Sequence, residues 1–180
     1  MTEKIRVLTR KRVLKHKQMK ELILIRHGKS SWKNDLKDHD RPLKKRAYED
    51  VKIVAEELLK SRQYSDFLMK SSTAVRAKHT AQLYAELLQI DESKLSIEEQ
   101  LYNFDMFDVL HFLKHIPASV NRLILVGHNP AFTEVANFLG DKYFSYLPTS
   151  GLVKLKLNSE NWLDLQRGTT EFFIFPKDYR

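Results

Sequence analysis

The stretch Leu22-Ile23-Leu24-Ile25-Arg26-His27-Gly28 decides the fold of this chain of 180 residues. Four consecutive apolar residues are typical of a strand that is buried on both faces, as in a parallel sheet. The run ends in two side chains that can carry positive charge, followed by glycine. In open α/β sheets, ligands bind just beyond the carboxyl ends of the strands. Arg26 and His27 therefore stand where a reactive centre is expected.

Strand and helix patterns alternate along the chain. A second run of four apolar residues, at 123–126, repeats the pattern of the first, and short strands are predicted at 67–69 and 95–97. Apolar side chains recur at helical spacing in four segments, which predicts helices at 47–60, 74–88, 105–117 and 132–139. Ser71-Ser72-Thr73 supplies N-cap candidates for the second helix and Asp105 for the third, and Gly140 is expected to end the fourth.

The C-terminal part of the chain has a different pattern. Beyond residue 148, apolar residues alternate with Lys154 and Lys156, which predicts a strand with one face in water. Residues 162–165 and 172–175 are predicted to form further strands. Because strands alternate with helices before this part, we predict an α/β fold with a doubly wound, mostly parallel sheet flanked by helices. Antiparallel strands are expected at its C-terminal edge.

The positive charge of the chain is concentrated at its start. Residues 1–20 hold eight Lys or Arg and one Glu, which accounts for +7 of the formal net charge of +8. We therefore expect a basic N-terminal extension over residues 1–20, either disordered or preceding a natural start at Met19. The rest, 21–180, is expected to form a single domain. Residues 21–180 carry almost no net charge and so offer no basic surface for a polyanion; nucleic acid is not an expected partner.

Composition excludes other classes of protein. The chain has no cysteine, which excludes disulfides and thiolate zinc sites and fits a reducing compartment. No apolar run approaches the ~20 residues that span a bilayer. We therefore expect a cytoplasmic protein without a membrane partner.

Three loops that follow predicted strands carry side chains able to bind an anion. The first holds Arg26 and His27, the second leads to Arg76, and the third holds His128. If the strands are parallel, all three loops open at one edge of the sheet. Arg76 lies in the first turn of its helix, where the helix dipole disfavours a cation. A bound anion reverses that penalty, because helix N–H groups and the guanidinium then share one ligand. The pattern predicts an anion site.

Five segments of the chain extend this pattern. They are Arg26-His27-Gly28-Lys29-Ser30-Ser31-Trp32, Asp40-Arg41-Pro42-Leu43, Ser71-Ser72-Thr73-Ala74-Val75-Arg76-Ala77, Leu101-Tyr102-Asn103 and Gly127-His128-Asn129-Pro130. In this order they resemble the histidine phosphatase superfamily, and within it the compact SixA-type phosphohistidine phosphatase branch. The resemblance runs from Glu21 nearly to the C-terminus. It implies a three-layer α/β/α fold of the phosphoglycerate-mutase-like kind.

The resemblance also implies roles for individual residues. His27 would be the nucleophile that becomes phosphorylated, and Arg26, Arg76 and His128 would form the phosphate pocket. Further contacts to substrate or phosphate are expected from Gly28, Arg41, Ser72 and Asn129. Glu99 is a candidate general acid. The scheme requires no metal and no other cofactor.

The expected activity is that of a metal-independent phosphatase with a phosphohistidine intermediate on His27. A neutral imidazole can attack phosphorus in line and divide one difficult displacement into two easier ones. Phosphohistidine on a protein is the favoured substrate, and inorganic phosphate is the product. A protonated phosphohistidine ring leaves as neutral imidazole, whereas an alkoxide needs a proton donor. The alternatives are a phosphatase or mutase of small phosphate esters, and a catalytically weak module that binds phosphate or a phosphoprotein.

Overall fold

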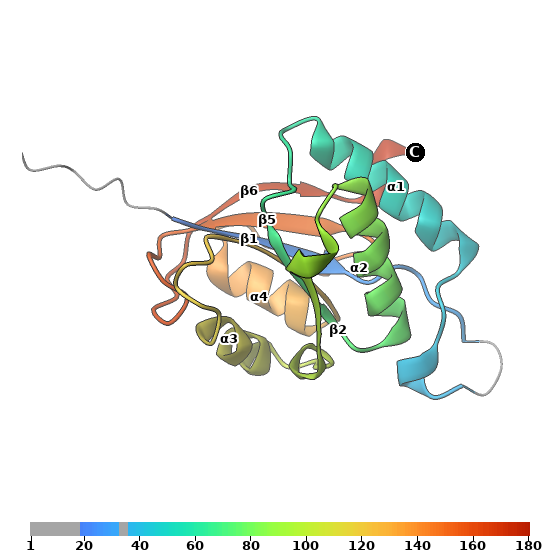
Figure 1. Cartoon of the computed structure of the whole chain (residues 1–180), viewed down its shortest axis with the longest axis horizontal. Coiled ribbons are helices and arrows are strands. Elements are labelled where there is room, and N and C mark those ends of the chain that lie inside the picture. Colours follow the sequence, from blue (N-terminus) through green and yellow to red (C-terminus); the bar gives the residue numbers. More distant parts are fainter. Residues whose placement is uncertain (1–18, 33–35) are drawn as a thin grey trace, which may run out of the picture.

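The computed structural model describes residues 19–32 and 36–180, so the expected extension up to residue 18 and part of the loop after Trp32 lie outside the described residues. Within the described part, the strands form one six-stranded sheet with the order β3-β2-β4-β1-β5-β6 (Figure 1). The strands are β1 (Lys20–Arg26), β2 (Leu68–Ser72), β3 (Leu95–Glu98), β4 (Arg122–Gly127), β5 (Leu152–Leu157) and β6 (Thr169–Ile174).

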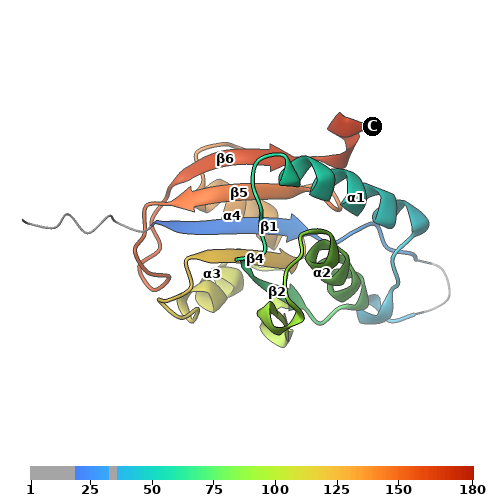
Figure 2. The same ribbon diagram turned by 45° about the horizontal axis from the view of Figure 1, so that its top comes forward.

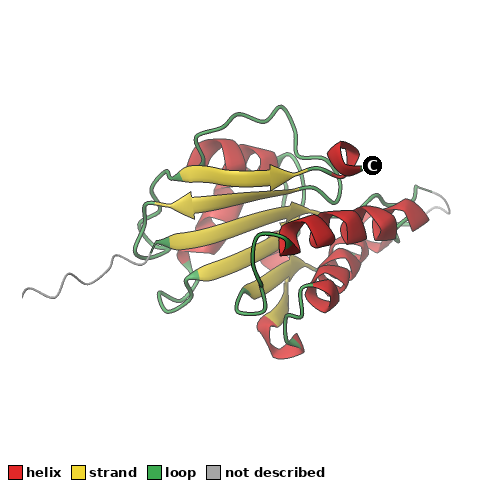
Figure 3. Cartoon of the chain, turned by 90° about the horizontal axis from the view of Figure 1, so that it is seen from above, coloured by secondary structure: helices red, strands yellow, loops and turns green. Residues whose placement is uncertain are grey.

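Helices cover both faces of the sheet. Figure 2 shows α1 and α2 in front of the strands and α4 behind them, and Figure 3 shows the strands side by side between these layers. The α-helices are α1 (Lys45–Leu59), α2 (Val75–Leu87), α3 (Met106–Lys114) and α4 (Ala131–Leu139). Short 3-10 helices are η1 (Asp38–Asp40), η2 (Glu92–Lys94), η3 (Glu99–Leu101) and η4 (Pro176–Tyr179). None of the described helices has the length and apolar character needed to cross a membrane. The predicted three-layer α/β/α fold is confirmed.

The directions of the strands also agree with the prediction. β1 and β2 each run parallel to β4, and β3 runs parallel to β2. β5 is antiparallel to β1, and β6 is antiparallel to β5, as the arrowheads in Figure 2 show. The C-terminal strands therefore break the parallel pattern. Of these two strands, only β6 lies at an edge of the sheet, because β5 is inserted between β1 and β6.

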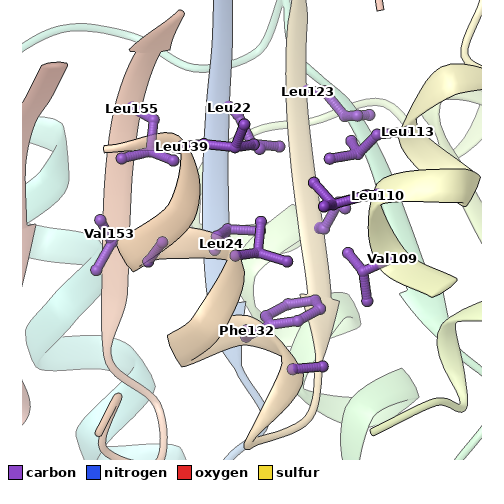
Figure 4. Packing of buried hydrophobic residues seen from close by; sticks show 14 of the residues in the cluster. Leu22, Leu24, Val109, Leu110, Leu113, Leu123, Phe132, Leu139, Val153 and Leu155 are labelled. Atoms are coloured by element: carbon purple, nitrogen blue, oxygen red, sulfur yellow. The ribbon is translucent and has the colours of Figure 1, made fainter. Parts of the chain in front are cut away.

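β1 divides its side chains between two hydrophobic cores. Leu22 and Leu24 pack towards α3 and α4, where Figure 4 shows Leu22 near Leu139 and Leu24 near Phe132. Ile23 and Ile25 pack on the opposite face, against residues of α1 and α2. All four are fully buried. This two-sided burial is the reason why the run contains no polar residue.

Two lysines that were expected in water are buried. Lys154 was expected on a wet face of β5, but β5 lies inside the sheet, and the Nζ atom of Lys154 pairs with Glu21 at 2.7 Å and Glu171 at 2.8 Å. Lys20 was assigned to the basic extension, but it is the first residue of β1. Its Nζ atom donates to two backbone carbonyl oxygens and to Oδ1 of Asn121. Sheet order and these acceptors, which the local pattern does not reveal, bury both ammonium groups.

Two local predictions were wrong. Residues 71 and 72 belong to β2, and the N-cap of α2 is Ala74, whose own side chain cannot cap; its N–H donates to Oγ of Ser72 at 3.3 Å. Residues 162–164 form bends, and no strand is present at 162–165. Trp162 is fully buried there, and its Nε1–H group donates to the carbonyl oxygen of Val120 at 2.7 Å. The apolar character of this segment reflects one anchored indole and not a strand pattern.

Gly127 ends β4 and lies against the ring of Phe132. A Cβ atom at position 127 would lie 2.5 Å from Cζ of that ring, which is closer than such atoms approach. We expect Gly127→Ala to lower the free energy of unfolding by about 1–3 kcal/mol, because the core is overpacked there. Urea denaturation measures this loss.

The double variant with Phe132→Leu provides the control. The smaller side chain relieves the clash, so the loss caused by Gly127→Ala should be smaller in this background than in the wild type. Strictly additive losses in the double-mutant cycle would contradict the assigned contact.

Candidate active site

The register of two parallel strands brings two histidines together. β1 and β4 pair Arg26 with Gly127, and a histidine follows in each chain segment. The backbone N–H of His27 donates to the carbonyl oxygen of Gly127 at 3.0 Å, and the centroids of the rings of His27 and His128 lie 5.0 Å apart. Both side chains are buried. The two predicted histidines therefore form one pair at the carboxyl edge of the sheet.

β2 and α2 add two residues to this edge. β2 pairs Ser71 with Val126 of β4, so that the Oγ atom of Ser72 lies 2.8 Å from Nε2 of His128. α2 begins at Val75, shortly after β2 ends, and its first turn carries Arg76. The guanidinium of Arg76 is buried although it lies at the positive end of the helix dipole. Hydrogen-bond acceptors around the guanidinium must offset the unfavourable electrostatic energy of a cation at this end of the helix.

Two hydrogen bonds define the tautomer of His27. Its Nδ1 atom lies 2.8 Å from the carbonyl oxygen of Gly28, which can only accept, so Nδ1 carries the proton. Its Nε2 atom accepts from Nε of Arg76 at 3.3 Å. The lone pair of Nε2 therefore faces a guanidinium. A phosphoryl group bound by that guanidinium would lie within reach of a nucleophilic nitrogen.

His128 has the opposite tautomer. The guanidinium of Arg76 can only donate, and its Nη2 atom lies 3.4 Å from Nδ1 of His128, so Nδ1 is the acceptor. The proton is then on Nε2, which donates to Oγ of Ser72. Arg76 thus contacts both histidines and keeps an unprotonated nitrogen of each ring directed towards itself.

Burial keeps both rings neutral. It lowers the pKa of His27 to about 3, and the three arginines of the site act in the same direction, while the hydrogen bond to the Gly28 carbonyl opposes them. Burial also lowers the pKa of His128 to about 2, with further contributions from His27 and Arg76. A neutral His27 keeps its lone pair available at physiological pH.

Arg26 and Asn129 meet at the loop before β5. Nη1 of Arg26 and Nδ2 of Asn129 both donate to the carbonyl oxygen of Leu147, at 2.8 and 2.9 Å. Nε of Arg26 and Oδ1 of Asn129 are buried and have no hydrogen-bond partner among the described residues. Arg26 therefore retains an N–H group that an anion can accept from.

Asp38, in η1, contributes the carboxylate of the site. Its Oδ2 atom accepts from Nη2 of Arg76 at 2.9 Å and from the hydroxyl of Tyr102 at 3.0 Å. Its Oδ1 atom pairs with Nη2 of Arg41 at 3.0 Å. Partial burial alone would raise the pKa of Asp38, but the hydrogen bonds from Tyr102 and Arg76 outweigh it and lower the pKa. Asp38 is therefore ionised.

The charges of the site suit a phosphoryl dianion. We call Arg26, Arg41 and Arg76 the arginine cluster. Its three positive charges face one negative charge, that of Asp38, while both histidines are neutral. The balance is two positive charges, equal and opposite to a phosphoryl dianion. Guanidinium groups also match the geometry of phosphate oxygens, to which they donate in pairs.

Aromatic rings surround this cluster. The ring of Trp32 stacks on the guanidinium of Arg41, with 3.5 Å between Cζ and the ring centroid, yet 78% of Trp32 is exposed. The rings of Tyr102 and Phe104 lie against His128, with centroid distances of 5.5 and 5.1 Å. The mouth of the site is thus partly apolar and open to solvent.

Two predicted site residues, Gly28 and Glu99, have surroundings that differ from those expected of a substrate contact and a general acid. The N–H of Gly28 donates to Oγ1 of Thr80 at 2.9 Å, and its carbonyl holds His27, so Gly28 orients the ring. Glu99 is exposed in η3, and no interaction among the described residues links it to the histidines or to the arginine cluster. The carboxylate found at the site is Asp38, to which the sequence motifs assign no role. Its one local signal was its spacing of three residues from Arg41.

A cavity of about 540 Å³ is lined by residues of β2, β3 and α3 and of the loop before α3. Its lining includes Lys70, Glu98, Asn103 and Asp108, together with side chains of α3. Asn103 separates Tyr102 from Phe104, so the loop that packs on His128 also borders the cavity. In residues 19–32 and 36–180, no three or more His, Asp or Glu side chains are grouped so as to hold a metal ion.

Residues 22–112 match the model of the histidine phosphatase superfamily (branch 1). Curated relatives include an uncharacterised chloroplastic protein of Arabidopsis thaliana, 28% identical over 79% of this chain and 69% of its own length. An uncharacterised protein of Mycobacterium tuberculosis (strain H37Rv) is 27% identical over 80% of this chain and 93% of its own.

Solved structures give a consistent result. A protein assigned as phosphohistidine phosphatase SixA from Agrobacterium tumefaciens superposes with a TM-score of 0.70 at 26% identity, covering 86% of this chain and 97% of its own. The protein histidine phosphatase SixA in complex with tungstate superposes with a TM-score of 0.74 at 19% identity, covering 89% and 99%. At 19% identity, the similarity to this second structure shows a shared fold and no more.

The depressed pKa of His27 predicts a pH-dependent stability. The unfolded chain protonates this ring near pH 6.5, whereas the folded protein does so only near pH 3. Between these values the unfolded state binds the extra proton, so the free energy of unfolding falls as pH decreases below 6.5. The contribution of His27 amounts to about 2 kcal/mol between pH 7.5 and pH 5.

Urea denaturation of His27→Gln at both pH values measures this contribution, because the variant lacks the ionising ring. Its stability should depend less on pH than that of the wild type by that amount. His79→Gln, which changes an exposed residue of α2, is the matched control. Equal pH dependence in wild type and His27→Gln would contradict the prediction.

Proposed function

The chain belongs to the histidine phosphatase superfamily, and from this premise we propose that it dephosphorylates phosphohistidine on proteins through a covalent intermediate on His27. The observation that carries the proposal is the tautomer of His27. Its Nδ1–H is held by the Gly28 carbonyl, and its Nε2 lone pair faces Arg76. A nitrogen nucleophile is thereby presented to an anion-binding group.

In the first step, Nε2 of His27 attacks phosphorus and the bond from phosphorus to the leaving group breaks. The arginine cluster neutralises charge on the phosphoryl oxygens, where charge is spread in the transition state. Phosphorylation makes the His27 ring cationic, and the hydrogen bond from Nδ1 to the Gly28 carbonyl stabilises that cation. A cationic ring is also a good leaving group for the second step.

In the second step, the oxygen of a water molecule attacks phosphorus and the bond between phosphorus and Nε2 breaks. Inorganic phosphate is released, and His27 returns to its neutral form. The depressed pKa of His27 supports this return, because the free ring then carries no second proton at physiological pH.

The state of Asp38 supports phosphohistidine over phosphate esters as substrate. Hydrogen bonds from Tyr102 and Arg76 lower the pKa of this carboxylate before substrate binds, so it meets the substrate ionised and brings no proton for a leaving group. Within the described part of the chain, the exposed Glu99 contacts none of the site residues, so its role as the acid gains no support. A protonated phosphohistidine ring leaves as neutral imidazole without a donor, whereas an alkoxide requires one.

The open mouth supports a protein substrate. Trp32 and Phe104 are exposed beside the arginine cluster and His128, and the cavity next to loop 102–105 adds a hollow surface. Exposed aromatic side chains at a site commonly contact a macromolecular partner. A small metabolite would leave most of this surface in water.

Trapping the intermediate tests the nucleophile. Rapid quenching with radiolabelled phosphoramidate should give an acid-labile phosphoenzyme, and His27→Ala should lower turnover by at least about 10³-fold and abolish the label. His79→Ala, which alters an exposed ring on α2, should leave the label intact. Substantial turnover of His27→Ala would falsify the assignment. Phosphate binding without any label in the wild type would favour a binding module.

Substrate class needs a separate comparison. We expect kcat/KM for phosphohistidine peptides to exceed that for sugar phosphates by about 10²-fold or more, which is the scale of a missing general acid. Parallel assays of phosphate release under the same conditions measure the ratio. A higher kcat/KM for sugar phosphates would favour a phosphatase or mutase of small esters.

A further inference from the structure

Asp38 takes up much of the hydrogen-bonding capacity of two arginines, through its carboxylate and its backbone oxygen. Arg76 donates through Nη1 to the backbone oxygen of Asp38 and through Nη2 to its Oδ2 atom. Arg41 pairs with Oδ1 through Nη2 and donates through Nε to the same backbone oxygen. One residue of η1 thus contacts both guanidiniums, each of which is buried.

The donors of Arg76 are almost fully committed. Nε donates to His27, and Nη2 divides its two hydrogens between Asp38 and His128. Nη1 donates one hydrogen to the backbone of residue 38. A phosphoryl group that accepts from Nη2 must therefore displace one of these partners. Asp38 is the negatively charged one, so it is repelled by the incoming anion.

We propose that Asp38 is a positioning residue that holds Arg76 and Arg41 in the empty site and exchanges with the phosphoryl group when substrate binds. The carboxylate is the internal counterion of these guanidiniums. It keeps them in place without a ligand, and it competes with the phosphate that must leave after hydrolysis. This inference rests on the phosphate pocket of the proposed function.

The exposure of Asp38 fits such an exchange. Its side chain is 42% exposed, whereas that of Arg76 is 2% exposed. The carboxylate can therefore turn to water without opening the core, while the guanidinium stays fixed by His27 and His128. Tyr102, which donates to Oδ2, lies on the same rim and is the second partner that Asp38 gives up.

Asp38→Asn tests the exchange, with Asp40→Asn as matched control. Both aspartates lie in η1 and carry equal charge, but Asp40 contacts the ring of His39 and is exposed. Calorimetric titration with inorganic phosphate and with tungstate, at one pH and ionic strength, should show at least about tenfold tighter binding for Asp38→Asn. Asp40→Asn should differ from the wild type by less than about twofold, because an exposed charge is screened.

Kinetics give a second readout. Competition by phosphate should become stronger in Asp38→Asn, with a lower inhibition constant and a lower KM. Asp38→Glu, which keeps the charge, should restore phosphate affinity towards that of the wild type. A structural role alone predicts the opposite sign, since misplaced arginines bind phosphate more weakly.

The outcomes separate this inference from the proposed function. Unchanged or weaker phosphate binding by Asp38→Asn, with normal binding by the wild type, overturns the exchange and leaves the phosphatase proposal intact. Failure of the wild-type protein to bind phosphate or tungstate overturns the pocket itself. Thermal unfolding of each variant confirms that affinities are compared between folded proteins.

Discussion

The parallel pairing of β1 with β4 is the constraint on which the rest of the structure depends. The run from Leu22 to Ile25 forms the strand that pairs with β4, helices bury it on both faces of the sheet, and the register ends with Arg26 opposite Gly127. Every further group of the site is placed relative to that point: Ser72 by the neighbouring β2, and Arg76 by the helix that follows β2. Burial of the apolar strands therefore determines where the polar residues of the site lie.

The electrostatics of the site follow from burial among cations. A histidine beside guanidiniums and out of water is held neutral, so the same surroundings that attract an anion also preserve a nucleophilic lone pair. Arg76 connects the two effects, because it contacts His27, His128 and Asp38. Its burial costs free energy unless each donor finds an acceptor, and these three residues supply them. The pocket is preorganised by its own internal partners.

The α/β class, the strand directions and the meeting of His27 with His128 could be predicted, because buried strands have continuous apolar sequences whose ends lie at one edge. The burial of Lys154 could not, since its partners Glu21 and Glu171 are distant in the sequence and lie on the two strands that flank β5. Asp38 was missed because its neighbours are charged, as in any solvated loop, and because its partner Arg76 is far along the chain. The catalytic roles of the site residues stay predictions, since geometry alone does not measure turnover.

The central place of β1 has a consequence for biosynthesis. The first of the described strands to leave the ribosome, β1, is flanked by β4 and β5, where Leu22 pairs with Leu123 and Leu155. Its backbone N–H and C=O groups therefore stay unpaired until β4 and β5 have been synthesised. Contacts between residues so far apart in the sequence slow folding. Until then, an apolar segment of high strand propensity is exposed to aggregation, which is the situation that chaperones relieve. The strand that leads to His27 is therefore synthesised early, but its pairing in the sheet is completed late.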